Sequence, residues 1–153
     1  MDKSFEIIRK TRQNILSQVS ELTIDQLNEI PAGFNNNIIW NLAHMVAAQQ
    51  GVCYVRGGLP LVIKEAFFLA YRPDTKPQGP LDAAQFEEIK QLMFSTIDVL
   101  EADYKKGLFK HNPSWTNRYG IELPVIEDSL HFLLYHEGIH FGYIMALKRM
   151  VKK

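Results

Sequence analysis

Apolar side chains recur every three or four positions along four stretches of the chain, the spacing of helices that bury one face. The first helix is expected at 5–22, where Phe5, Ile8 and Ile15 begin its apolar face. The other three are expected at 38–56, 81–106 and 124–150. No stretch shows the two-residue alternation of a half-buried strand. The pattern therefore predicts an all-α protein.

Residues that start helices stand at several of these boundaries. Thr23 and Gln26 match a capping box, which predicts a short extra turn after the first helix. The asparagines at 35–37 can cap the second helix, and Asp82 can cap the third. Pro124 is expected to open the last helix. These signals agree with the boundaries that the apolar pattern predicts.

The segment between the second and third helices, residues 57–80, is rich in proline and glycine. It is far longer than the roughly 2–8 residues that usually join neighbouring helices of a bundle. A crossover explains this length, because it lets the two helices run parallel. The apolar stretch at 66–71 is expected to pack against the bundle end. We therefore expect one domain over 1–153, a four-helix bundle with a long crossover between helices 2 and 3.

The histidines of the last helix indicate a metal site. His136 and His140 are one turn apart, so their Cβ atoms lie roughly 5–6 Å apart and both can reach one ion. They occupy positions where a bundle normally places leucine, and should face inward. His44 lies on the corresponding stripe of the second helix, next to short side chains that leave space. Since bundles build metal sites from facing helices, we predict a site formed by His44, His136 and His140.

Three neutral imidazoles leave an ion its full charge and open positions, an arrangement typical of catalytic sites. Zinc is the first expectation for this divalent metal, with nickel or iron(II) as alternatives, because imidazole suits all three. The alternative without metal treats the histidines as ordinary core or surface residues. His111 lies in an expected loop and His131 on another side of the last helix, so neither is expected to be a ligand.

The string HEGIH also matches the H-E-x-x-H pattern of metalloproteases. The third ligand of those enzymes usually lies further along the chain, but no histidine, aspartate or glutamate follows His140. A protease is therefore not expected. Glu137 can still border the metal as a catalytic proton acceptor, with packing, support of a ligand, or contact with solvent as the alternatives.

Three further residues are candidates for substrate binding. Arg12 falls inside the apolar sector of the first helix. There it can bind an anionic substrate group, pair with an acidic residue, or pack its stem and reach water with its head. Asn41 and Tyr143 lie on the histidine stripes, one turn from His44 and His140, with packing as the alternative for Tyr143.

Charge and composition narrow the choice of partners. Basic and acidic residues number 17 each, and no block of like charge stands out beyond the short basic tail. Binding to nucleic acid or to an anionic membrane is therefore not expected. The chain has neither a signal core nor the ~18 apolar residues of a spanning helix. Its single cysteine, Cys53, is expected in the core and fits a reducing compartment, so we expect a soluble, cytoplasmic protein.

With these histidines in place, the chain resembles the DinB-like superfamily of metal-binding four-helix bundles. The resemblance is carried by W-x-x-x-H at Trp40 to His44, by H-x-x-x-H-x-G-x-I at His136 to Ile144, and by the preceding PAGFNNNIIW. It implies a crossover bundle, a metal held by the three histidines, and a homodimer packed through helices. Tyr143 stands where the family frequently has glutamine, so any role of that glutamine is in question here.

Characterised members of this superfamily include thiol transferases that use low-molecular-weight thiols such as bacillithiol, and a mycothiol-dependent isomerase. The resemblance therefore favours a metal-dependent thiol S-transferase that acts on a small-molecule substrate with a thiol cosubstrate. A metal-dependent hydrolase using the same site is one alternative. A non-catalytic, stress-related dimer, with or without a stabilising metal, is another. DNA repair ranks last, because the sequence carries no basic surface signature.

Overall fold

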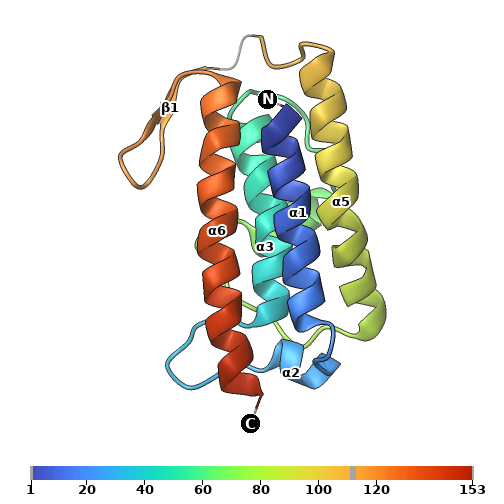
Figure 1. Ribbon diagram of the computed structural model, residues 1–153. Helices are drawn as coiled ribbons and strands as arrows, with labels where there is room; N and C mark the ends of the chain where they lie inside the picture. Colours follow the sequence, from blue (N-terminus) through green and yellow to red (C-terminus); the bar gives the residue numbers. More distant parts are fainter. Residues whose placement is uncertain (1, 111–112, 153) are drawn as a thin grey trace.

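The chain folds into a bundle of four long helices, shown in Figure 1 as a computed structural model that describes residues 2–110 and 113–152. The long helices are α1 (Asp2–Val19), α3 (Ile38–Gln50), α5 (Ala83–Lys105) and α6 (Ile126–Val151). Two short helices lie in the connections, α2 (Ile24–Asn28) and α4 (Glu65–Tyr71). The predicted all-α fold is confirmed.

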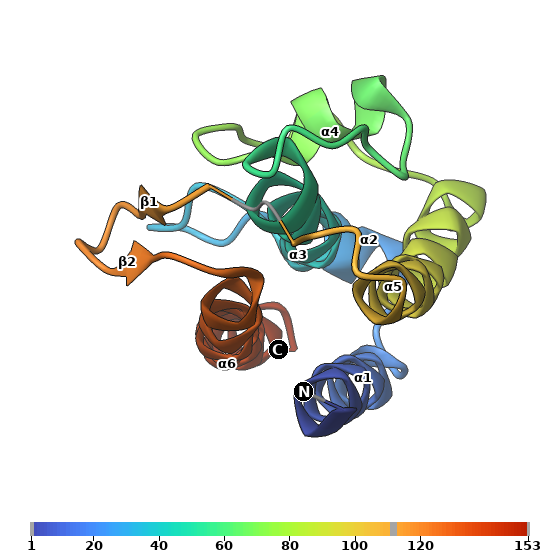
Figure 2. The same ribbon diagram turned by 90° about the horizontal axis from the view of Figure 1, so that it is seen from above.

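The long helices form a ring in which α1 and α3 occupy opposite corners (Figure 2). Both α1 and α3 pack against α5 and α6. In Figure 1, α1 and α6 run downward, whereas α3 and α5 run upward. The second and third long helices are therefore parallel, as the long crossover predicts.

Polar caps account for where several helices begin. Asn37 caps α3 by accepting a hydrogen bond from the Trp40 backbone N–H at 2.9 Å. Capping boxes open α2 at Thr23 and α5 at Asp82, as expected. The last helix begins at Ile126 rather than at Pro124, after an extended Val125.

The second long helix is buried along its whole α-helical length. It continues beyond Gln50 as a π-helical turn, η1 (Gly51–Val55). A π turn shifts the angular phase of the residues that follow it. Val55 is consequently 46% exposed, although regular helical spacing places it on the inward stripe. Cys53 is fully buried, in agreement with its expected place in the core.

The apolar stretch of the crossover forms α4, which lies along the outer side of α3 and not at the bundle end as expected (Figure 2). Its Phe67 and Tyr71 pack against the core from this side. The ring of Phe68 lies over Gly51, where a Cβ atom would stand 3.6 Å from it. Since this is an ordinary van der Waals distance, α4 packs closely on this part of the helix, and it completes the burial of α3.

A short hairpin precedes α6, although no strand is expected from the sequence. Strand β1 (Trp115–Thr116) pairs antiparallel with β2 (Glu122–Leu123). The side chain of Asn117 closes the turn by accepting hydrogen bonds from the backbone N–H groups of Tyr119 and Ile121. Two-residue strands are too short to produce a readable alternation, which explains why the pattern does not predict them.

Every helix within residues 2–110 and 113–152 is too short or too polar to span a bilayer.

Candidate metal centre

Three histidines from two facing helices meet inside the bundle. His44 comes from α3, and His136 and His140 come from successive turns of α6. Their ring centroids are 5.4 Å apart for His44 and His136, 4.9 Å for His44 and His140, and 4.4 Å for His136 and His140. One ring nitrogen from each lies within 4.8 Å of the others. The predicted convergence of these side chains is confirmed.

The backbone of α4 orients His44. The Nδ1 atom of His44 lies 2.7 Å from the carbonyl oxygen of Tyr71, the last residue of α4. Because a carbonyl only accepts hydrogen bonds, we assign the proton to Nδ1, and Nε2 keeps its lone pair for a metal. The indole of Trp40 stacks on the imidazole with a centroid separation of 4.7 Å and an angle of 10°. The plane and the tautomer of His44 are thus both held by the protein.

An asparagine orients His140. The Nδ1 atom of His140 lies 2.8 Å from Oδ1 of Asn41. The Asn41 side-chain nitrogen donates to the Asn37 carbonyl at 2.7 Å and to Oδ1 of Asn36 at 2.9 Å. The Asn37 carbonyl requires a donor, which places the amide oxygen of Asn41 toward His140. Nε2 of His140 is therefore also left with a free lone pair.

His136 is held differently from the other two. Its Nδ1 is buried and has no hydrogen-bond partner within the part of the chain that the structure describes. Its ring packs near that of Phe132, with centroids 6.0 Å apart. A buried polar atom without a partner is costly. Without a hydrogen bond at Nδ1, the ring of His136 is oriented by its packing against Phe132 and the neighbouring histidines.

The surroundings keep all three imidazoles neutral. Burial, reinforced by the neighbouring histidines, lowers the pKa of His136 to about 2. Burial and the charge of His44 lower the pKa of His140 to about 3. The pKa of His44 is lowered as well, mainly by burial, although its bond to Tyr71 opposes the shift. Neutral imidazole is the form that binds metal, so no proton has to be displaced near pH 7.

These residues fit a divalent ion. Two nitrogens bound to one zinc ion at about 2.1 Å in tetrahedral geometry stand roughly 3.4 Å apart. The histidine nitrogens lie within 4.8 Å of one another, so side-chain rotation would have to shorten any distance above the tetrahedral value for all three to bind one ion. A carbonyl or amide oxygen behind a metal-binding imidazole is a common support for such ligands. The cluster can therefore hold a metal ion.

Arg12 and Glu137 form a buried ion pair beside this cluster. Their exposed fractions are 0% and 2%, and Nη2 of Arg12 lies 2.7 Å from Oε1 of Glu137. The guanidinium also donates to the carbonyls of Met93 at 2.6 Å and Met45 at 3.4 Å. Burial raises the pKa of Glu137, and Arg12 opposes the rise. Of the interpretations for Arg12, pairing with an acidic residue is the one present, and its head does not reach water.

The other expected roles stay predictions. Both oxygens of Glu137 lie within hydrogen-bonding distance of Arg12, and proton transfer by Glu137 has to occur from within this ion pair. The amide of Asn41 is occupied by His140 and by asparagines at the start of α3. Tyr143 is half-buried and packs edge-on against Phe34, with ring centroids 5.5 Å apart. Substrate contacts of Arg12, Asn41 and Tyr143 remain to be tested.

Two further histidines, His131 and His111, are predicted not to be ligands. His131 is exposed on α6 and lies outside the cluster, as expected. His111 lies outside the residues that the structure describes.

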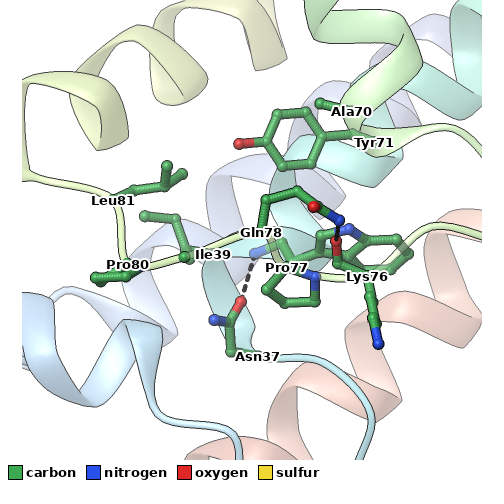
Figure 3. Close-up of a pocket in the computed structure, with 11 residues that line it drawn as sticks. Asn37, Ile39, Ala70, Tyr71, Lys76, Pro77, Gln78, Pro80 and Leu81 are labelled. Carbon is green, nitrogen blue, oxygen red and sulfur yellow. Dashed lines mark hydrogen bonds between the residues drawn. The ribbon is translucent and has the colours of Figure 1, made fainter.

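A pocket of about 260 Å³ adjoins the surroundings of His44 (Figure 3). Trp40 and Tyr71, which both contact His44, are among its lining residues. The rest of the wall comes mainly from the loop at 76–81, and none of the three histidines lines it. Trp40 and Tyr71 thus contact both the pocket and the three-histidine cluster.

Sequence reasoning missed several residues around the centre. The Tyr71 carbonyl is a backbone group in a connection, and no side-chain pattern marks it. Arg118, in the hairpin turn, pairs with Asp74, in the loop after α4, with Nη2 and Oδ2 3.1 Å apart. The charge of Arg118 contributes to the lowered pKa of His44 and His136, after the larger effect of burial. These two loop residues are distant in sequence and carry no shared motif.

Comparison with known proteins agrees with this geometry. The family model described as the DinB superfamily matches residues 7–144, a range that contains all three histidines, the whole of α3 and most of α6. No curated protein matches the chain. Because the family model covers most of the sequence, the chain belongs to the DinB superfamily.

Proposed function

We propose that the protein is a metal-dependent enzyme of the thiol S-transferase type, with a divalent ion, zinc first, held by His44, His136 and His140. One observation carries the proposal: two of the three imidazoles donate through Nδ1 to fixed oxygen acceptors, which leaves their Nε2 atoms for a metal. Histidines that only fill the core need neither these hydrogen bonds nor ring nitrogens that come within 4.8 Å of one another. A three-histidine donor set also leaves coordination positions open, as catalytic sites require.

An ion in this position supplies positive charge that favours the thiolate form of a thiol, which is the reactive form. The residues around it contribute orientation and a dry environment. Trp40 and Phe132 pack against His44 and His136, and both are almost fully buried. His140 is the most accessible of the three.

The proposed reaction joins a small thiol to an electrophilic carbon. The thiol loses its proton to solvent, its sulfur forms a bond to the carbon, and the leaving group departs with the electron pair of the broken bond. No net oxidation or reduction occurs. The structure supports this through its neutral, buried ligand set, and the resemblance to thiol-using members of the superfamily supplies the substrate class.

The test is turnover of 1-chloro-2,4-dinitrobenzene with a panel of low-molecular-weight thiols by the zinc-loaded protein. His44→Ala is expected to lower the rate by at least a hundredfold while the circular dichroism spectrum is retained. His131→Ala is the matched control, because it removes an exposed histidine of α6 outside the cluster, and should retain the rate. Equal rates in the two variants, or no thiol-dependent rate with wild type, would overturn the proposal.

A further inference from the structure

We propose that Arg118 binds an anionic group, a carboxylate in particular, of the substrate that enters the three-histidine site, and that Asp74 occupies the guanidinium when no substrate is present. This inference rests on the proposed function and names the class of molecule that the site accepts. It is carried by the position of two loops that meet beside the histidines.

Each loop is attached to a different ligand of the centre. Asp74 follows Tyr71 by three residues, and the Tyr71 carbonyl holds His44. On the other side, the ring of Tyr119 lies 6.2 Å from that of Phe132, which in turn packs against His136. Arg118 precedes Tyr119 in the hairpin turn and reaches across to Asp74. The ion pair therefore connects the surroundings of His44 with those of His136.

These two attachments hold the guanidinium of Arg118 and the carboxylate of Asp74 on the side of the cluster where the two loops meet. An anion bound to this guanidinium therefore lies between the loop that holds His44 and the hairpin that packs toward His136.

The ion pair is built in a way that allows exchange. Arg118 is 56% exposed and Asp74 is 82% exposed, and pairs of this exposure are weak. Only Nη2 of the guanidinium is used by Asp74, so its other donors remain for a substrate carboxylate that binds in a two-pronged manner. Water competes well for both partners, which leaves Arg118 easily released.

The backbone at Asp74 gives an independent sign of a specialised position. With φ of 67°, Asp74 is the only non-glycine residue in the described part of the chain whose φ is positive. Such a conformation is uncommon outside glycine and clusters at binding and switch regions. At Asp74 it accompanies a carboxylate that pairs with the cation of the opposite loop.

The test uses Co²⁺-loaded full-length protein, because thiolate binding to Co²⁺ gives a near-ultraviolet charge-transfer band. The probes are mercaptoacetate and 2-mercaptoethanol, which each carry one thiol but differ by a carboxylate. The measured quantity is the ratio of their two dissociation constants. Intrinsic differences between the thiols cancel when this ratio is compared between variants.

Arg118→Gln is expected to reduce the preference for mercaptoacetate by about tenfold, the effect of losing one charge-assisted contact. Asp74→Asn is expected to increase the preference, because it removes the competing carboxylate and keeps the arginine. Arg56→Gln is the matched control. It removes a guanidinium 4.7 Å from the ring centroid of Trp115 on the same hairpin, and should leave the preference unchanged.

A purely structural tie between the loops makes a different prediction. Arg118→Gln and Asp74→Asn then break the same ion pair and shift the preference in the same direction, or leave it unchanged. Either result overturns the proposal, as does an unchanged preference in Arg118→Gln. Binding of the substrate carboxylate by Arg118 predicts that the two variants shift the preference for mercaptoacetate in opposite directions, whereas loop stabilisation does not.

Glycolate, the hydroxyl counterpart of mercaptoacetate, separates this inference from the proposed function. If neither thiol produces the band, the thiol-transfer function is wrong. If glycolate changes the visible Co²⁺ spectrum of the wild type and this change is lost in Arg118→Gln, the anion site is still supported. If glycolate has no effect on the spectrum, or has the same effect in Arg118→Gln, the anion site is overturned. A protein that binds no Co²⁺ overturns both.

Discussion

Among individual residues, the three imidazoles of the cluster differ in what holds them. His44 and His140 each donate to an oxygen, whereas His136 has a buried Nδ1 without a partner in the described residues. The supports also differ, because His44 depends on a backbone carbonyl and His140 on the side chain of Asn41. Substitution can therefore remove the support of His140 alone.

Asn41→Ala is expected to weaken zinc binding about 10- to 100-fold, because His140 loses the acceptor that fixes its tautomer and ring orientation. The dissociation constant can be measured by competition with a chromophoric chelator. Asn36→Ala serves as the control, since it removes a partner of the Asn41 amide but leaves the bond to His140 in place. A similar loss in both variants would mean that Asn41 acts through general packing and not through His140.

Among helices, Arg12 joins all four long elements at one guanidinium. From α1 it binds Glu137 of α6, the Met93 carbonyl of α5 and the Met45 carbonyl of α3. Met45 directly follows His44, and Glu137 directly follows His136. The guanidinium thus links α3 and α6 next to the residues that form the cluster.

Glu137→Leu is expected to lower the free energy of unfolding by about 3–5 kcal/mol, because it leaves the Arg12 charge buried without its partner. The double variant Arg12→Met with Glu137→Leu should recover a large part of this loss, since no buried charge remains unpaired. Urea unfolding of the metal-free protein measures both values.

An exposed ion pair between α1 and α5 supplies the comparison. Arg9 binds Asp98, whose side chain is 66% exposed. Asp98→Ala is expected to cost less than about 1 kcal/mol, as exposed pairs usually do. If Glu137→Leu costs no more than Asp98→Ala, the buried pair does not have the structural role assigned to it.

At the level of the whole molecule, the sequence predicts what depends on local spacing. The interval between His136 and His140 determines their common face, and Asn37 and Asp82 mark helix starts through their own side chains. The contacts that orient the ligands depend on tertiary structure. The Tyr71 carbonyl reaches His44 only because α4 lies along α3, and nothing in the local pattern of 66–71 specifies that position.

The same distinction explains the other differences. A π-helical turn at Gly51 changes the phase of α3, and regular helical spacing cannot anticipate it. The pairing of Arg118 with Asp74 joins two connections that are far apart in sequence. The homodimer implied by the family resemblance stays a prediction, which the molecular mass in solution can test.

The central claim is that His44, His136 and His140 together hold one metal ion, and the metal content of purified protein tests it most directly. After equilibration with a slight excess of Zn²⁺ and removal of free ion, elemental analysis should give about one zinc per chain for wild type and His131→Ala. His44→Ala and His136→Ala should each retain far less. Wild-type protein without a stoichiometric ion, or full zinc content in His44→Ala, would contradict the account.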